Sequence, residues 1–189
     1  MKPDPTRNAI GLVEFSSIAA GYVAQDAMFK AAPVARLLAR TICSGKYLVV
    51  IAGEVAAVEA AVAAGAAQAS GALLEQCAIA RVHPAVFPAI AGTVDLAPGE
   101  ARALGIIETF SAASIIAAAD AAAKAANVIL LRIHLAMALG GKGFALMTGD
   151  VASVEAGVAA GCAVAGKEGM LAGRGVIPAP GPELFEEYL

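Results

Sequence analysis

Short apolar runs punctuate the chain, and the first three of them have the length of β-strands. They cover residues 10–15, 34–42 and 47–52, and each is rich in branched aliphatic or aromatic side chains. The second and third runs meet at residues 43–46, a turn that contains Gly45. The pattern therefore predicts three strands in this part of the chain, the last two joined by a tight turn.

Helical segments separate and follow these strands. Ser16 or Ser17 is suited to cap a first helix, which continues to about Ala32 before Pro33 ends it. Glu54 opens a second helix, because an acidic side chain suits the positive end of the helix dipole. The valines that share one face of this second helix are Val55, Val58 and Val62.

Nearly the whole chain is an internal duplication. Residues 9–15, AIGLVEF, return as residues 103–109, ALGIIET. The other pairs in register are Asp26 with Asp120, Lys30 with Lys124, Gly45-Lys46 with Gly141-Lys142, Gly53-Glu54-Val55 with Gly149-Asp150-Val151, and Val58-Glu59 with Val154-Glu155. The second copy gains two residues between Arg132 and Gly141, and residues 82–84 are aligned with residues 176–178.

Each copy therefore predicts one small α+β domain, in the order strand, helix, strand, strand, helix, strand, short helix. A turn-rich stretch at residues 92–99 separates the copies. The predicted boundaries are residues 8–92 for the first domain, 93–100 for the linker and 101–185 for the second domain. Two similar domains in one chain favour pseudo-symmetric assembly, in which three chains arrange their domains in a ring.

The composition looks at first like that of a membrane protein, because 59% of the 189 residues are hydrophobic. A membrane-spanning helix, however, needs about 20 almost uninterrupted apolar residues. The longest uncharged interval lies only between Glu59 and Glu75, and alanine supplies most of the hydrophobicity. We therefore expect no membrane-spanning segment and a surface that is largely buried against other chains.

Charge, the start of the chain and cysteine usage exclude further classes. A net charge of −3 without a basic patch argues against nucleic-acid binding. Residues 1–5 lead into no apolar segment of the kind that signal peptides contain. Three cysteines without CxxC spacing are typical of a reduced cytosolic protein and not of a disulfide framework.

Several phrases of the repeat resemble the bacterial microcompartment (BMC) shell domain. They are AIGLVE at residues 9–14, DAMFKA at 26–31, GEVAAVEAAV at 53–62 and, in the second copy, GDVASVE at 149–155. Two such domains in unpermuted order resemble the trimeric, tandem-domain class of propanediol-utilisation shell proteins. The resemblance implies two ferredoxin-like α+β domains, each with an antiparallel four-stranded sheet and helices on one face, in a trimer shaped like a pseudohexamer.

The resemblance also has implications for function. It implies a structural protein without enzymatic activity, a wall tile with a central pore. Such tiles pack edge to edge with other BMC shell proteins, and together they enclose a compartment within the cytoplasm.

Within this resemblance, Cys43 is the residue of greatest interest. The class implies a cysteine here on the threefold axis, where three copies, one per chain, hold a [4Fe-4S] cluster for electron transfer across the shell. Enclosed redox enzymes are the further partners that such a cluster implies. Ser44 stands where relatives have proline, which is expected to loosen the loop. Zinc, or an empty thiol-lined pore, remains the alternative at Cys43.

Two loops are expected to line the central pore. One surrounds Cys43, and the other contains the two-residue insertion. Glycines in the second loop allow a close backbone approach to an axis, although a simple hairpin turn explains them as well. The predicted pore-loop residues besides Cys43 are Thr41, Ile42, Ser44, Gly45, Met137, Ala138, Leu139, Gly140 and Gly141.

Lys30 and Lys124 are expected at the lateral edges of the tile. The resemblance implies that such lysines of neighbouring tiles lie antiparallel and hydrogen-bond across the seam, whereas ordinary solvated lysines are the alternative. The family often has arginine between the prolines of its last motif, and Ala179 replaces it here. The loss of a multidentate donor is expected to weaken the lateral contact.

The remaining chemistry-bearing residues form no catalytic pattern. Cys77 and Cys162 are expected in the core, and His83 and His134 lack metal-ligand spacing. The absence of a nucleophile–base pair, a phosphate-binding loop and a GxGxxG motif argues against an enzyme. A ligand-sensing trimer is disfavoured because a sensor needs no lateral tiling surface. The leading hypothesis is a shell tile with a cluster in its pore, and the alternative is a cluster-free tile whose pore conducts small polar metabolites.

Overall fold

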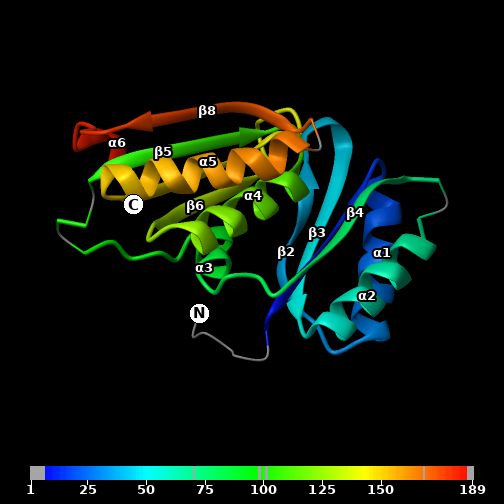
Figure 1. Cartoon of the computed structure of the whole chain (residues 1–189). Helices are drawn as coiled ribbons and strands as arrows, with labels where there is room; N and C mark the ends of the chain where they lie inside the picture. The colour runs from blue at the N-terminus through cyan, green and yellow to red at the C-terminus, as the bar shows by residue number, and fades with distance from the viewer. Residues whose placement is uncertain (1–6, 70, 98, 101, 168, 187–189) are drawn as a thin grey trace. The chain divides into compact units, whose positions relative to one another are not determined.

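The computed structural model of this chain describes residues 7–69, 71–97, 99–100, 102–167 and 169–186. The chain divides into two compact units, one of residues up to Val82 and the other of residues from His83 onward. We call them the N-terminal unit and the C-terminal unit. Each unit contains one four-stranded sheet (Figure 1).

The N-terminal unit is a two-layer α+β domain. Its sheet has the order β2-β3-β1-β4, and every neighbouring pair of strands is antiparallel. Helices α1 and α2 pack against each other on one face of this sheet (Figure 1). The predicted antiparallel, ferredoxin-like arrangement is confirmed. The elements are β1 (Ala9–Phe15), α1 (Ile18–Ala31), β2 (Ala35–Ile42), the short helix η1 (Cys43–Gly45), β3 (Lys46–Gly53), α2 (Val55–Ala67) and β4 (Leu73–Ala80).

The C-terminal unit repeats this plan. Its sheet has the order β6-β7-β5-β8, again antiparallel throughout, and helices α4 and α5 pack together against it. None of the helices in the described part of the chain is long and apolar enough to cross a membrane. The elements are α3 (Val86–Ala91), β5 (Ala103–Thr109), α4 (Ala112–Ala125), β6 (Ile129–Leu135), β7 (Gly143–Gly149), α5 (Val151–Lys167), β8 (Leu171–Ile177) and α6 (Glu183–Glu186).

The repeat and the compact units divide the chain at different places. The repeat places α3 at the end of the first copy, within the predicted domain of residues 8–92. The contacts of α3, however, are with β6 and α4, so the helix belongs to the C-terminal unit. The end of the first repeat is therefore packed against the second repeat. Pro98 of the predicted linker and Ala101 at the predicted start of the second domain lie outside the described residues.

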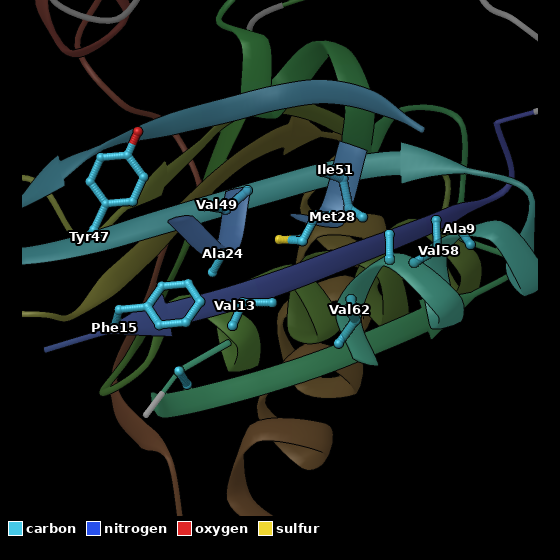
Figure 2. Packing of buried hydrophobic residues seen from close by; sticks show 12 residues of the cluster. Ala9, Val13, Phe15, Ala24, Met28, Tyr47, Val49, Ile51, Val58 and Val62 are labelled. Atoms are coloured by element: carbon cyan, nitrogen blue, oxygen red, sulfur yellow. The ribbon is translucent and has the colours of Figure 1, made fainter. Parts of the chain in front are cut away.

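The core of the N-terminal unit lies between the sheet and its two helices. Met28 and Ala24 of α1, Val58 and Val62 of α2, and Val13, Val49 and Ile51 of the sheet meet there (Figure 2). The two helices approach closely at Gly65, where an added Cβ would lie 2.6 Å from Cγ of Met28. Small residues on facing helices thus allow the close packing that the alanine-rich composition predicts.

The predicted start of the first helix is confirmed, and the second repeat has the same kind of cap. Ser17 caps α1, since its side-chain oxygen accepts a hydrogen bond from the backbone N–H of Ala20 at 3.3 Å. Ser111 caps α4 in the same way and accepts from the backbone N–H of Ser114 at 3.1 Å. Each cap satisfies one of the backbone donors that a helix leaves unpaired at its first turn.

The strand register corrects one part of the predicted repeat. Ile79 pairs with Ile10 of β1, and Ile177 pairs with Leu104, the counterpart of Ile10 in β5. Ile79 therefore corresponds to Ile177, so residues 82–84 correspond to residues 180–182, and the predicted match with residues 176–178 is wrong. The physical reason is that the second copy has gained four residues by this point. Two lie in the loop between β6 and β7, and the segment from the start of α5 to the start of β8 is two residues longer than the segment from the start of α2 to the start of β4.

Candidate functional site

Cys43, Ser44 and Gly45 form the short turn between β2 and β3, next to Thr41 and Ile42 at the end of β2. Cys43 is half-buried, whereas Ser44 and Gly45 are exposed. Ser44 and Gly45 both have left-handed backbone conformations, with φ of 63° and 71°. Because the proline ring holds φ near −65°, the serine allows a loop conformation that proline excludes.

An ion pair fixes the loop at its C-terminal side. The ammonium of Lys46, the residue after Gly45, lies 2.8 Å from Oε1 of Glu14 on β1, and the Glu14 side chain is only 7% exposed. Sequence reasoning did not identify this pair. A signal was present, because the same two residue types recur as Glu108 and Lys142, which lie 3.0 Å apart.

The second predicted pore loop joins β6 to β7 through residues 136–142. The backbone is left-handed at Ala136, Ala138, Gly140 and Gly141, with φ between 56° and 95°. The strand register confirms that the two extra residues of the second copy fall within this loop. Leu135 pairs with Gly143 across seven intervening residues, whereas its counterpart Thr41 pairs with Tyr47 across five. The longer loop contains four residues with left-handed backbone conformations, whereas the three-residue loop around Cys43 contains two.

His134 holds the start of this second loop. Its Nε2 lies 2.8 Å from the carbonyl oxygen of Met137, and its ring stacks on Phe144 with centroids 5.1 Å apart. The Met137 side chain is 44% exposed, and Leu139 accepts a hydrogen bond from the backbone N–H of Lys142 at 3.2 Å. His134 is therefore a hydrogen-bond partner of the loop backbone.

The residues of one chain do not by themselves complete a metal site. Among the described residues, no group of three or more histidine, cysteine, aspartate or glutamate side chains is placed to hold a metal ion. Cys162 is buried in α5, where burial raises the pKa of its thiol while Arg174 acts in the opposite direction. Cys77 lies on β4 and lines a shallow surface groove with Glu59 and Val62. Cys43 is thus the cysteine that is presented on a loop.

The two predicted edge lysines have equivalent local contacts. Lys30 pairs with Asp26 one helical turn earlier, and Lys124 pairs with Asp120. The Lys30 side chain is 75% exposed and that of Lys124 is 44% exposed, so both are accessible in the single chain. Their predicted hydrogen bonds across a seam between tiles remain a prediction.

Comparison with known proteins agrees with this architecture. The family model of the BMC domain matches residues 9–82 and again residues 103–180. The chain is 42% identical to bacterial microcompartment shell protein PduT of Citrobacter freundii over 183 residues, which cover 96% of this chain and 97% of that protein. The two matched segments coincide with the two sheet-and-helix repeats.

Solved structures share the fold. The crystal structure of a microcompartments protein from Desulfitobacterium hafniense superposes with a TM-score of 0.90 at 50% identity, and the match covers 94% of this chain and 98% of that one. The fused permuted hexameric shell protein MSM0275 from the RMM microcompartment has the same fold at 20% identity, with a TM-score of 0.59 over 84% of this chain and 83% of that one. The two family matches and the near full-length identity to a shell protein show that this chain belongs to the BMC-domain family and is a structural shell protein of a bacterial microcompartment.

Proposed function

We propose that three copies of this chain close into a pseudohexameric ring that forms one tile of a microcompartment shell in the cytoplasm. The support is the common architecture of the two halves, which have the same strand order and the same pair of packed helices. Three chains with two such halves supply six similar domains, the number that a hexameric shell protein has. The tile has a structural and not a catalytic role and packs against other BMC shell proteins along its edges.

We further propose that the pore of this tile binds a [4Fe-4S] cluster through Cys43 of each chain. The observation that carries this is the difference between the two loops, since Cys43 in the short loop has no counterpart in the longer one. A ring therefore has three copies of the Cys43 loop and three copies of the longer loop. Three thiolates that meet on the axis suit iron–sulfur chemistry, and they leave one iron for another ligand.

The protein's own part in this site is to hold the thiols. The left-handed turn at Ser44 and Gly45 exposes the loop tip, and the Glu14–Lys46 pair ties its base to β1. When bound, the cluster supplies one-electron transfer across the shell, with enclosed redox enzymes as the partners.

The second candidate is a tile without a cluster, whose pore conducts small polar metabolites or binds zinc at the three thiols. Its support is the loop between β6 and β7, in which Ala136, Ala138, Gly140 and Gly141 have left-handed backbone conformations. An exposed left-handed loop also offers backbone groups to a passing polar molecule.

Anaerobic purification, a visible absorption spectrum and iron and sulfide analysis distinguish the two candidates. We expect a brown protein with about four irons per trimer, lost in Cys43→Ala and retained in the control Cys77→Ala. A trimer that stays colourless after reconstitution with iron and sulfide would contradict the cluster and leave the metabolite-conducting tile. Bound zinc in the same elemental analysis would assign the thiols to zinc instead. Analytical ultracentrifugation of the same sample tests the trimer, and electron microscopy for sheets or tubes tests the tiling.

A further inference from the structure

The corrected register shows that α3 and α6 are counterparts. Residues 83–87, HPAVF, align with residues 181–185, GPELF. The two segments begin with the same turn, since Val86 N–H donates to the carbonyl of His83 at 3.0 Å and Leu184 N–H donates to that of Gly181 at 3.1 Å. What α3 does at the end of the first repeat is therefore a guide to what α6 does at the end of the second.

Segment α3 packs on the first helix and on the edge strand of the following repeat. It packs against α4 and β6, and Val86 is fully buried there. The backbone N–H of His83 donates to Oδ1 of Asp120 at 2.7 Å, while the other oxygen of Asp120 binds Lys124. The Asp120 side chain is only 9% exposed, so this is a well-covered contact between consecutive repeats.

The matching surface of the N-terminal unit is open. Asp26 is the counterpart of Asp120 and makes the same pair with Lys30, yet its side chain is 63% exposed. Tyr22 on the same helix is 60% exposed, whereas its counterpart Ile116 is fully buried. Ile18 of α1 is also exposed, at 37%, whereas its counterpart Ala112 is fully buried. An apolar patch next to an accessible carboxylate thus lies where the other repeat is covered.

Segment α6 has an open side of its own. Phe185 is buried against Leu104, Leu131 and Leu146 of its own sheet, which holds the segment in place. Leu184, the counterpart of the buried Val86, is 40% exposed. The single chain therefore makes this contact once, between α3 and the second repeat. The corresponding surfaces, on α6 and on α1, are both exposed.

We infer that α6 of one chain packs on α1 and β2 of a second copy of this chain, with Leu184 on the apolar patch and the Gly181 backbone N–H donating to Asp26. This inference rests on the proposed ring, because a ring of consecutive repeats needs the contact of α3 again at each boundary between chains. Phe185 stays on its own sheet.

Charge supports a second copy of this chain as the occupant. Residues 183–187 contain three glutamates, whereas the corresponding residues 85–89 contain no charged residue. On the receiving side, Arg36 of β2 is exposed and takes the place of the buried Leu130 of β6. At the described positions, the contact between chains thus has Glu183 in place of Ala85 on one side and Arg36 in place of Leu130 on the other.

Disulfide trapping tests this contact directly. In a background with Cys43→Ser, Cys77→Ser and Cys162→Ala, we expect Asp26→Cys with Gly181→Cys to form covalent dimers and trimers on oxidation. The matched control, Asp120→Cys with His83→Cys, should close within one chain and give no covalent oligomer, since these residues already lie in hydrogen-bond contact. A native trimer without covalent oligomers, alongside a control that closes, would overturn the contact and leave the ring intact. A chain that is monomeric at all concentrations would overturn both.

A second variant tests the contact without disulfide geometry. Leu184→Glu should leave the chain folded by circular dichroism, because the side chain is exposed in the single chain. It should weaken association about tenfold per contact, since it places a charge in an apolar patch. The control Glu155→Gln, on α5, should leave association unchanged. Unchanged sedimentation of Leu184→Glu would overturn the proposed contact.

Discussion

At the scale of single residues, the two ion pairs beside the predicted pore loops show how burial determines the contribution of an interaction to stability. Glu14 and Glu108 occupy the same position in β1 and β5, and each binds the lysine that follows its loop. The Glu14 side chain is 7% exposed, whereas that of Glu108 is 40% exposed. The same pair is therefore screened by water in one repeat and largely shielded from it in the other.

Glu14→Ala should destabilise the chain more than the matched change Glu108→Ala. The first leaves Lys46 beside a buried site without its acceptor, which costs about 1.5–3 kcal/mol. The second removes a solvated pair, worth about 0–1 kcal/mol. Urea unfolding of both variants measures the difference, and equal losses would contradict the assignment of Glu14 as the anchor of the Cys43 loop.

Gly45, in the same loop, adopts a left-handed backbone conformation that glycine allows without strain. Its φ is 71°, and an added Cβ would meet no atom within 4 Å, so Gly45→Ala changes only the backbone preference. We expect a loss of about 1–2 kcal/mol in the free energy of unfolding. Gly166→Ala in α5, where an added Cβ also meets nothing, should instead raise stability by about 0.5–1 kcal/mol. Opposite signs in the two variants, measured by urea unfolding, would establish the conformational cause.

At the scale of elements, the two corresponding helices α2 and α5 begin differently. Asp150 caps α5, since its carboxylate accepts hydrogen bonds from the backbone N–H and the hydroxyl of Ser153 at 2.8 and 2.7 Å. These bonds favour the ionised form and lower the pKa of Asp150 below its usual value. Glu54 stands at the start of α2 and makes no side-chain cap.

The lowered pKa of Asp150 predicts a pH dependence for α5. The contribution of the cap is fully present above the unfolded-state pKa of about 4 and is lost as the pH falls through the lower folded-state pKa. Asp150→Asn should therefore flatten the fall of the thermal midpoint in acid, whereas Glu54→Gln should leave that fall nearly unchanged. Thermal unfolding monitored by circular dichroism across the acid range measures both. An acid profile of Asp150→Asn that matches the unaltered chain would contradict the cap.

The elements also show where local pattern was sufficient. The starts of α1 and α4 follow from Ser17 and Ser111, because capping depends on residues within one turn. The alignment of residues 82–84 was wrong because a short similar phrase does not show how many residues the second copy gains in the β6–β7 loop and between the starts of α5 and β8. Only the pairing of Ile79 and Ile177 with their strands reveals it.

At the scale of the whole molecule, two aspartates at corresponding positions of the repeats have different contacts. Asp120 accepts a hydrogen bond from the backbone of His83, whereas Asp26 binds only Lys30 among the described contacts. The duplication supplies two copies of one surface, and the single chain covers one of them.

Asp120→Ala should lower the stability of the dissociated chain by about 1.5–3 kcal/mol, because it leaves a covered backbone N–H and Lys124 without their acceptor. Asp26→Ala should change it by less than about 0.5 kcal/mol, because its pair with Lys30 is solvated. Urea unfolding at high dilution tests both. At high concentration, Asp26→Ala should lower the thermal midpoint through loss of assembly, as mass action requires. A concentration-independent loss in Asp26→Ala would contradict an assembly role.

The sequence by itself determined the duplication, the order of strands and helices in each copy, the cap of the first helix and the cysteine-bearing turn. These depend on periodicity and on neighbours within a few residues, which one chain displays directly. The tertiary structure decided the register of the last strands, the buried Glu14–Lys46 pair and the packing of α3 on the following repeat. Each of these joins residues far apart in the chain, and the choice among such pairings depends on helix lengths, burial and long-range contacts that no local pattern contains.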